Sequence, residues 1–229
     1  MDKRFFVVFD EFQEVSKLNG GDFEKQLRSV IQHQQSVSYV FMGSKTHLLM
    51  QMFTSKERAL YHSGKLFSLN KIAKEKMHAY IKNRFLNTGI EFSDALIDRL
   101  IDVTDNIPYY NQFLAAQLWQ VVQGGASGKS EQELLDDAVS NILSNQDEYY
   151  FSLFENMTLY QRAVIKAIVI DNKTIFSQGY HDRHNLTSPS STKRAVDSLV
   201  EHGVLEKIGK QYYFSDPFFP RWLALRNYA

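Results

Sequence analysis

Residues 3–15, KRFFVVFDEFQEV, place five apolar side chains directly before two carboxylates. The continuous apolar run Phe5–Phe9 is typical of a strand that is buried on both faces of a parallel sheet. Asp10 and Glu11 follow where that strand ends. Adjacent carboxylates there suit magnesium-dependent hydrolysis, one in the metal shell and one polarising the attacking water. An acidic turn that only closes the strand is the alternative, and the dipeptide alone leaves both interpretations open.

Helix and strand patterns alternate after this first strand. A helical pattern over DFEKQLRSVIQHQ is followed by a second apolar strand near Tyr39–Met42. The segment KLFSLNKI predicts a short third strand near Leu66–Leu69. Strands that are separated by helices imply a parallel sheet. We therefore expect residues 1–71 to form part of an α/β domain.

The pattern becomes helical throughout residues 72–150. Ser93 stands where an N-cap is expected before an apolar helix face. Pro108 occupies a position that the first turn of a helix tolerates, and it opens the run PYYNQFLAAQLWQVV. These signals predict an all-helical lid over this range.

Residues 151–229 combine helices with a hairpin. Thr158 and Gln161 form a capping-box pattern before an apolar run, and Gly203 stands where a helix-ending glycine belongs. Two strand-like segments then flank the turn Gly209–Lys210, of the type that places glycine first. Helices followed by a hairpin predict a winged helix-turn-helix.

The composition excludes several classes of protein. The 26 basic and 26 acidic residues cancel, so no whole-chain field directs the protein to nucleic acid or to an anionic membrane. Cysteine is absent, which excludes disulfides and thiolate catalysis and suits a reducing cytoplasm. No apolar run approaches the ~18 residues of a membrane span. We expect a cytoplasmic protein without a membrane partner.

Several sequence blocks together resemble a known family. They are VVFDEFQ, FMGS with the LLMQMF that follows it, LYHSGKLFSLNKI, IPYYNQFLAAQLW and DPFFPRWL. In this order, and over nearly the whole chain, they resemble the archaeal-type AAA+ ATPases, a group related to the STAND and origin-recognition ATPases. The resemblance implies an α/β plus all-α fold, with a partial parallel AAA+ sheet, a helical lid and a C-terminal winged helix.

The resemblance also implies roles for four residues. Asp10 would be the Walker B carboxylate of the magnesium shell, and so a metal and cofactor ligand. Glu11 would be the catalytic base, and Ser44 the sensor 1 residue that senses the γ-phosphate. Pro108 would be the lid proline that packs near the adenine of ATP.

Two residues depart from the family pattern. Asn106 stands where the lid motif has glycine, and Lys65 stands where many relatives carry an arginine that is a candidate finger. Lysine supplies charge but not the planar fork of arginine.

The larger departure is that the phosphate loop of this family is missing from this sequence. In the family the loop precedes the Walker B strand, and here only four residues precede that strand. The stretch QGGASGKS ends like G-x-x-x-x-G-K-[ST], but Gln123 stands at the position of the first glycine and no strand leads into it. A structural interpretation explains more: Gly124 ends one helix, and Ser130 with Glu133 caps the next.

Without the loop's backbone N–H groups and lysine, Asp10 and Glu11 would repel a triphosphate. We therefore expect this chain to be the C-terminal portion of a longer ATPase and to be inactive alone. ATP and Mg²⁺ would be cofactors of the intact parent, a switch that couples ATP state to the angle between lid and winged helix. We expect the open sheet edges to pair with the missing ATPase half or with another chain, including a homo-oligomer.

The winged helix leaves a second function open, that of a non-enzymatic DNA- or protein-binding module. Residues 151–229 carry ten Lys or Arg and seven Asp or Glu. Ser190, Lys193 and Arg194 are the candidate nucleic-acid contacts, while Asp197 on the same helix counters their charge.

Overall fold

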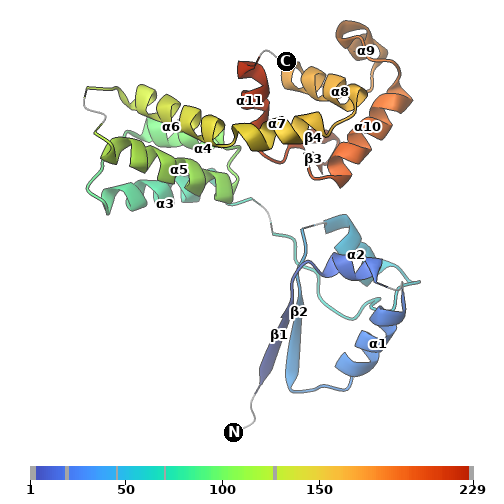
Figure 1. Ribbon diagram of the computed structural model, residues 1–229. Coiled ribbons are helices and arrows are strands. Elements are labelled where there is room, and N and C mark those ends of the chain that lie inside the picture. Colours follow the sequence, from blue (N-terminus) through green and yellow to red (C-terminus); the bar gives the residue numbers. More distant parts are fainter. Residues whose placement is uncertain (1–3, 19–20, 45, 70, 126–127, 227–229) are drawn as a thin grey trace. The chain divides into compact units, whose positions relative to one another are not determined.

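The computed structural model describes residues 4–18, 21–44, 46–69, 71–125 and 128–226 (Figure 1). The chain divides into two compact units, Met1–Asn70 and Lys71–Ala229. Among the described residues, no helix combines the length and the apolar character that a membrane crossing requires.

The first unit is built on two parallel strands. Its elements are β1 (Phe5–Phe9), the 3₁₀ helix η1 (Phe12–Lys17), α1 (Gly21–Ile31), β2 (Val37–Phe41) and α2 (Thr46–Thr54). β1 and β2 lie side by side (Figure 1), and their parallel register pairs Phe5 with Val37 and Phe9 with Phe41. Because the two strands end in register, the residues that follow them lie at the same edge of the sheet.

One face of this sheet carries the small core of the first unit. Phe12, Met52, Phe53 and Leu60 are buried, and Phe9 and Phe41 pack against them from the strands. The prediction that β1 is buried on both faces is wrong, since Phe6 is 74% exposed and Val8 is 54% exposed. The physical reason is that the described sheet has two strands and this core covers only one of its faces.

The third strand, predicted near Leu66–Leu69, is also absent from the described residues. This segment makes no ladder, and its side chains are open to solvent: Phe67 is 78% exposed and Leu69 98% exposed. An apolar segment becomes a strand only when a neighbouring strand accepts its backbone hydrogen bonds, and in the described sheet β1 and β2 bond to each other.

The second unit combines helices with a short hairpin. Its elements are α3 (Lys74–Leu86), α4 (Asp94–Val103), α5 (Pro108–Gln123), α6 (Glu131–Asn145), α7 (Asp147–Glu155), α8 (Leu159–Ile170), α9 (Gln178–His184), α10 (Pro189–Glu201), β3 (Leu205–Ile208), β4 (Gln211–Phe214) and α11 (Phe219–Leu225).

The helix ends predicted from sequence are confirmed. Ser93 accepts a hydrogen bond from the backbone of Leu96 at 3.3 Å. Ser130 and Thr158 each begin a complete capping box, so the GKS stretch at residues 128–130 is the entry to α6. Pro108 stands in the first turn of α5.

The hairpin is confirmed as well. β3 and β4 pair antiparallel around Gly209, whose φ of 63° is the left-handed value that a glycine-first turn requires. Of the two adjacent tyrosines in β4, Tyr212 is buried and Tyr213 is exposed, as alternation along a strand predicts.

A single hydrophobic core runs from the lid helices into the winged helix. At the junction, Phe218 of the winged helix packs edge-on against Tyr110 and Phe113 of α5, with ring centroids 5.9 and 6.3 Å apart. Tyr150 of α7 also donates a 2.9 Å hydrogen bond to Asp216. The lid and the winged helix therefore form one body, although the sequence pattern changes between them.

Candidate functional site

The candidate site lies where β1 and β2 end. The Met42 amide donates to the Phe9 carbonyl at 2.8 Å, and the Phe12 amide donates to the Met42 carbonyl at 2.8 Å. These two bonds hold together the segments that follow the two strands. Asp10 and Glu11 follow β1, and Ser44 follows β2.

The backbone of Glu11 adopts an uncommon conformation. Its φ of 47° and ψ of 39° lie in the left-handed region, which costs a non-glycine residue on the order of 1–3 kcal/mol. Its amide donates a 2.8 Å hydrogen bond to the Asp10 carboxylate. This turn places the two carboxylates at an exposed edge of the first unit.

The Glu11 carboxylate is held through one oxygen. Its Oε2 accepts hydrogen bonds from the Ser44 hydroxyl at 3.0 Å and from the Ser44 amide at 3.4 Å, and a third from the Gln13 side chain. The bond from Gln13, followed by those from Ser44, lowers the pKa of Glu11 from its ordinary value. The group is therefore ionised near neutral pH.

These residues would supply only part of a magnesium-nucleotide site. Carboxylate and hydroxyl oxygens are ligands that suit Mg²⁺, which usually keeps several waters and adds phosphate oxygens. Within the described ranges, no group of three or more His, Asp or Glu side chains could hold a metal ion alone. The residues present thus fit Mg²⁺ as part of a shell that ATP oxygens and further donors complete.

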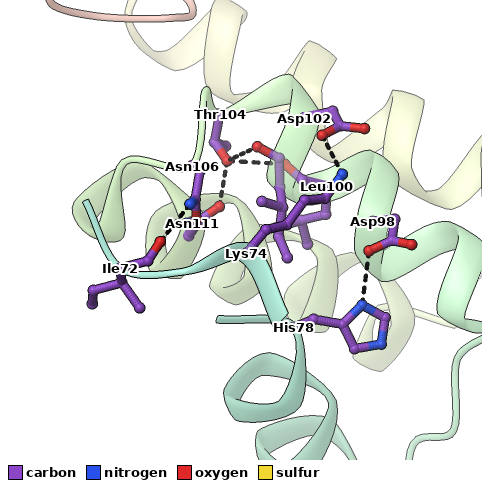
Figure 2. Close-up of polar contacts among 10 residues, drawn as sticks. Ile72, Lys74, His78, Asp98, Leu100, Asp102, Thr104, Asn106 and Asn111 are labelled. Carbon is purple, nitrogen blue, oxygen red and sulfur yellow. Dashed lines mark hydrogen bonds and ion pairs between the residues drawn. The ribbon is translucent and has the colours of Figure 1, made fainter. Parts of the chain in front are cut away.

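Pro108 belongs to the second unit. The turn before it contains a network of polar groups, which Figure 2 shows. Thr104 and Asn111 are fully buried and bonded to each other. The Asn111 amide also donates to Asn106 at 3.3 Å, and the Asn106 amide donates to the Ile72 carbonyl at 2.7 Å. This network fixes the turn that leads into Pro108.

Asn106 itself adopts a left-handed backbone with a φ of 53°. Asparagine tolerates this region better than most residues other than glycine. Asparagine at this position is therefore compatible with the left-handed turn and adds side-chain hydrogen bonds that glycine lacks.

The candidate nucleic-acid residues gather on α10. Ser190, Lys193 and Arg194 are exposed. Lys193 forms an ion pair with Asp197 one turn later, and this bond raises the pKa of the lysine. Arg194 makes no hydrogen bond or ion pair with any described residue, so its charge is the more available of the two.

Solved structures that share the fold span nearly the whole chain. A Walker-type ATPase of Pyrococcus abyssi matches with a TM-score of 0.67 and 15% identity, over 96% of this chain and 63% of that one. The ORC2 protein of Aeropyrum pernix in its ADP form matches with a TM-score of 0.53 and 13% identity, over 98% of this chain and 64% of that one. A RuvB variant of Thermotoga maritima gives 0.52 and 14%, over 93% and 67%.

Residues 148–225 match the model of a family described as "Probable winged helix domain". The chain has an AAA+-like fold that ends in a winged helix domain. At these identities the likeness shows the fold alone, and the chain spans less than two thirds of the length of the Pyrococcus ATPase. No curated protein matches the chain in sequence.

Within this AAA+-like fold, the described structure brings together three of the predicted site residues, Asp10, Glu11 and Ser44. Sequence reasoning missed a fourth participant, Gln13, which is 1% exposed and bonded to Glu11. The signal available in the sequence was a polar residue inside the block FDEFQEV, two positions after the carboxylate pair. Lys65, the candidate finger, is exposed and lies over the Phe67 ring, 5.0 Å from its centroid.

Proposed function

We propose that this chain provides the Walker B carboxylates, the sensor 1 residue, the lid and the winged helix of an AAA+ ATPase. The phosphate loop in this proposal comes from a segment outside these 229 residues. The observation that carries the proposal is the bond between Glu11 and Ser44, which joins a candidate base to a candidate γ-phosphate sensor at the ends of adjacent parallel strands.

The alternative reading of Asp10–Glu11 as a simple acidic turn fits this geometry less well. A turn that only ended β1 would not need Glu11 in a left-handed conformation. It would also not need the Glu11 carboxylate to accept a hydrogen bond from Ser44, which follows β2. Such conformations persist where the surroundings hold them, and they concentrate at functional sites.

Each residue has a stated task in this proposal. Bound Mg²⁺–ATP supplies the phosphoryl group that is attacked by water. Asp10 holds a place in the metal shell, and Glu11 accepts a proton from the attacking water. Ser44 holds Glu11 and would face the γ-phosphate of bound ATP. Pro108 would pack near the adenine, as the resemblance implies.

The lid and the winged helix share one hydrophobic core, and this limits which parts of such an ATPase can move when it acts as a switch. Separating the two would expose side chains at their junction, such as Phe218, which is fully buried and packs on the rings of Tyr110 and Phe113 in α5. In this proposal, ATP state therefore moves the whole second unit as one body, which replaces the change in angle between lid and winged helix that we expected from the sequence.

The experiment compares this chain with the protein extended by the sequence encoded before Met1. We expect no micromolar ATP affinity for the 229 residues by calorimetry, and Mg²⁺-dependent hydrolysis by the extended protein. Glu11→Gln in the extended protein should keep ATP binding and stop turnover, whereas Glu14→Gln is the matched control with turnover retained. Micromolar ATP binding by the 229 residues, an encoded extension without a glycine-rich Gly-Lys-Ser/Thr loop, or full turnover by Glu11→Gln contradicts the proposal.

A non-enzymatic DNA-binding module is the second candidate function. It is favoured by the match to a winged helix family and by the exposed Arg194 on α10. The ion pair between Lys193 and Asp197 counts against strong phosphate binding by this helix.

A further inference from the structure

Gln13 lies buried directly beneath the candidate base. Its side chain is 1% exposed, and its Nε2 donates a hydrogen bond to Glu11 Oε2. Its Oε1 is buried and has no hydrogen-bond partner among the described residues. A buried amide with an unsatisfied oxygen destabilises the folded chain, so its position calls for an explanation beyond packing.

The orientation of the Gln13 amide follows from its neighbour. A carboxylate can only accept, so the amide must turn its N–H₂ group toward Glu11 and its oxygen away. The unsatisfied oxygen is thus a consequence of the bond to Glu11.

Gly43 provides the space for this arrangement. A Cβ atom at residue 43 would lie 1.9 Å from Gln13 Oε1, far inside contact distance. Gly43 directly precedes Ser44 in the chain. The residue that leaves room for the Gln13 amide is therefore next to the residue that also bonds to Glu11.

The donors from Gln13 and Ser44 all reach the same oxygen of Glu11, Oε2. No described residue bonds to the other oxygen, Oε1. A carboxylate fixed through one oxygen presents the second in a single direction, which is the preorganisation that a general base requires.

We propose that Gln13 is a positioning residue: together with Ser44 it fixes Glu11 Oε2, so that Oε1 is presented as the proton acceptor, and Gly43 is required to admit its amide. The catalytic meaning of this arrangement rests on the proposed ATPase function. The contact itself does not, so it can be tested in the 229-residue chain without nucleotide.

The first measurement is the NMR signal of the Gln13 side-chain amide in protein labelled with ¹⁵N-glutamine, assigned through Gln13→Met. We expect its protons to exchange with water roughly tenfold more slowly than those of the exposed Gln26, because they bond to a charged group. Glu11→Ala should abolish this protection. Gly43→Ala should do the same, since its methyl group displaces only the end of a flexible side chain.

The second measurement is the side-chain rotamer of Glu11 from three-bond couplings. We expect one rotamer in the wild type and rotamer averaging in Gln13→Met and Gly43→Ala, with the double variant no different from either single variant. The control Gln26→Met should leave the Glu11 couplings unchanged.

A Gln13 that only filled space would leave the Glu11 rotamer intact when methionine of similar volume replaces it. A single Glu11 rotamer in Gln13→Met, or exchange of the Gln13 amide as fast as that of Gln26, therefore overturns the proposal. If the extended protein had no ATPase activity, the amide exchange of Gln13 and the rotamer of Glu11 would still be as expected. The proposed function and the positioning role of Gln13 can therefore be refuted independently.

Discussion

Asn106 ties the turn before α5 to the start of the second unit, because its side-chain amide donates a 2.7 Å hydrogen bond to the carbonyl of Ile72 (Figure 2). The neighbouring Lys71 adds a bond of 3.0 Å from its ammonium to the Asp105 carbonyl. Residues 71–72 directly follow the boundary between the two units. A glycine at position 106 could adopt the same backbone but could not hold this segment.

Two replacements of Asn106 should therefore distinguish the contribution of its side-chain hydrogen bonds to stability from the cost of its left-handed backbone. Asn106→Gly keeps the left-handed backbone but loses the bonds to Ile72 and Asn111, and we expect a loss of about 1 kcal/mol in the free energy of unfolding. Asn106→Ala also carries the strain of a left-handed residue, so its loss should be about 2 kcal/mol. Urea denaturation of the 229-residue chain measures both values.

Asp105→Gly is the control for this prediction. Asp105 has the same left-handed backbone, with a φ of 51°, and its side chain bonds to no described residue. We expect this change to be neutral or slightly stabilising. Equal stability of Asn106→Gly and the wild type would show that the side-chain bond to Ile72 contributes nothing.

Ser130 is expected to matter for stability and not for phosphate binding. Its hydroxyl accepts from the Glu133 amide while the Glu133 carboxylate bonds back to the Ser130 amide at 2.7 Å. Ser130→Ala should lower the free energy of unfolding by about 1 kcal/mol. Ser140→Ala, at an exposed position within α6, should have little effect. A change in ATP affinity of the extended protein without a loss of stability would instead support a phosphate-binding role.

The sequence predicted those features that depend on neighbouring residues. Caps such as Ser130 and the glycine-first turn at Gly209 need only a few adjacent positions, and the structure confirms them. The parallel pairing of β1 with β2 follows from strands separated by a helix. The Asp10–Glu11 turn and Ser44 could be placed together because strands that pair in parallel end at one edge.

The features that sequence reasoning missed depend on distant partners. A strand at Leu66–Leu69 requires a neighbouring strand, which no local pattern reports. The exposure of Phe6 depends on how many layers cover the sheet. The burial of Gln13 depends on residue 43, thirty positions later in the chain, being a glycine that has no side chain. Hydrophobic periodicity contains none of this information.

His78 should make the stability of the lid depend on pH. Its two ring nitrogens bond to Asp98 at 2.9 Å and to Asp94 at 3.1 Å, and Lys82 also binds Asp94. The bond to Asp98 raises the pKa of His78, burial lowers it, and the bond to Asp94 raises it further, with a net rise. The stabilising contribution is therefore complete below the unfolded pKa of about 6.5 and is lost as the pH rises through the folded value.

The measurement compares the wild type with His78→Gln by urea denaturation at about pH 5.5 and about pH 8.5. We expect the difference in free energy of unfolding between the two proteins to be larger at the acidic pH. His202→Gln, an exposed histidine on the winged helix without a carboxylate partner among the described residues, should show no such change. A difference that is the same at both pH values contradicts the prediction.

Binding to duplex DNA should separate the two candidate functions through α10. If the winged helix binds DNA, Arg194→Ala should weaken the affinity and reduce its salt dependence by about one phosphate contact. Lys193→Ala should have a smaller effect, because Asp197 already pairs with the lysine. Asp197→Asn should strengthen binding by releasing that lysine. Fluorescence anisotropy over a range of salt concentrations measures all three, and affinity that none of them alters excludes α10 as the DNA contact.

A partly buried carboxylate, that of Asp216, lies at the junction between lid and winged helix, and its ionisation should weaken the fold. Asp216 accepts hydrogen bonds from Tyr150 at 2.9 Å and from the Phe218 amide at 2.8 Å, yet burial is the larger influence and raises its pKa. Because the folded pKa exceeds the unfolded value of about 3.9, the contribution of this group to stability falls as the pH rises between the two.

Tyr150→Phe removes a donor to the ionised carboxylate, so it should raise the pKa of Asp216 further. At neutral pH we expect a loss of about 1–3 kcal/mol in the free energy of unfolding, and this loss should shrink as the pH falls and Asp216 becomes protonated. Tyr149→Phe, an exposed neighbour, should change the free energy by less than about 0.5 kcal/mol. Urea denaturation from about pH 4 to about pH 7 tests this, and a loss in Tyr150→Phe that grows as the pH falls would assign the Tyr150 hydroxyl a role other than stabilising the charged Asp216.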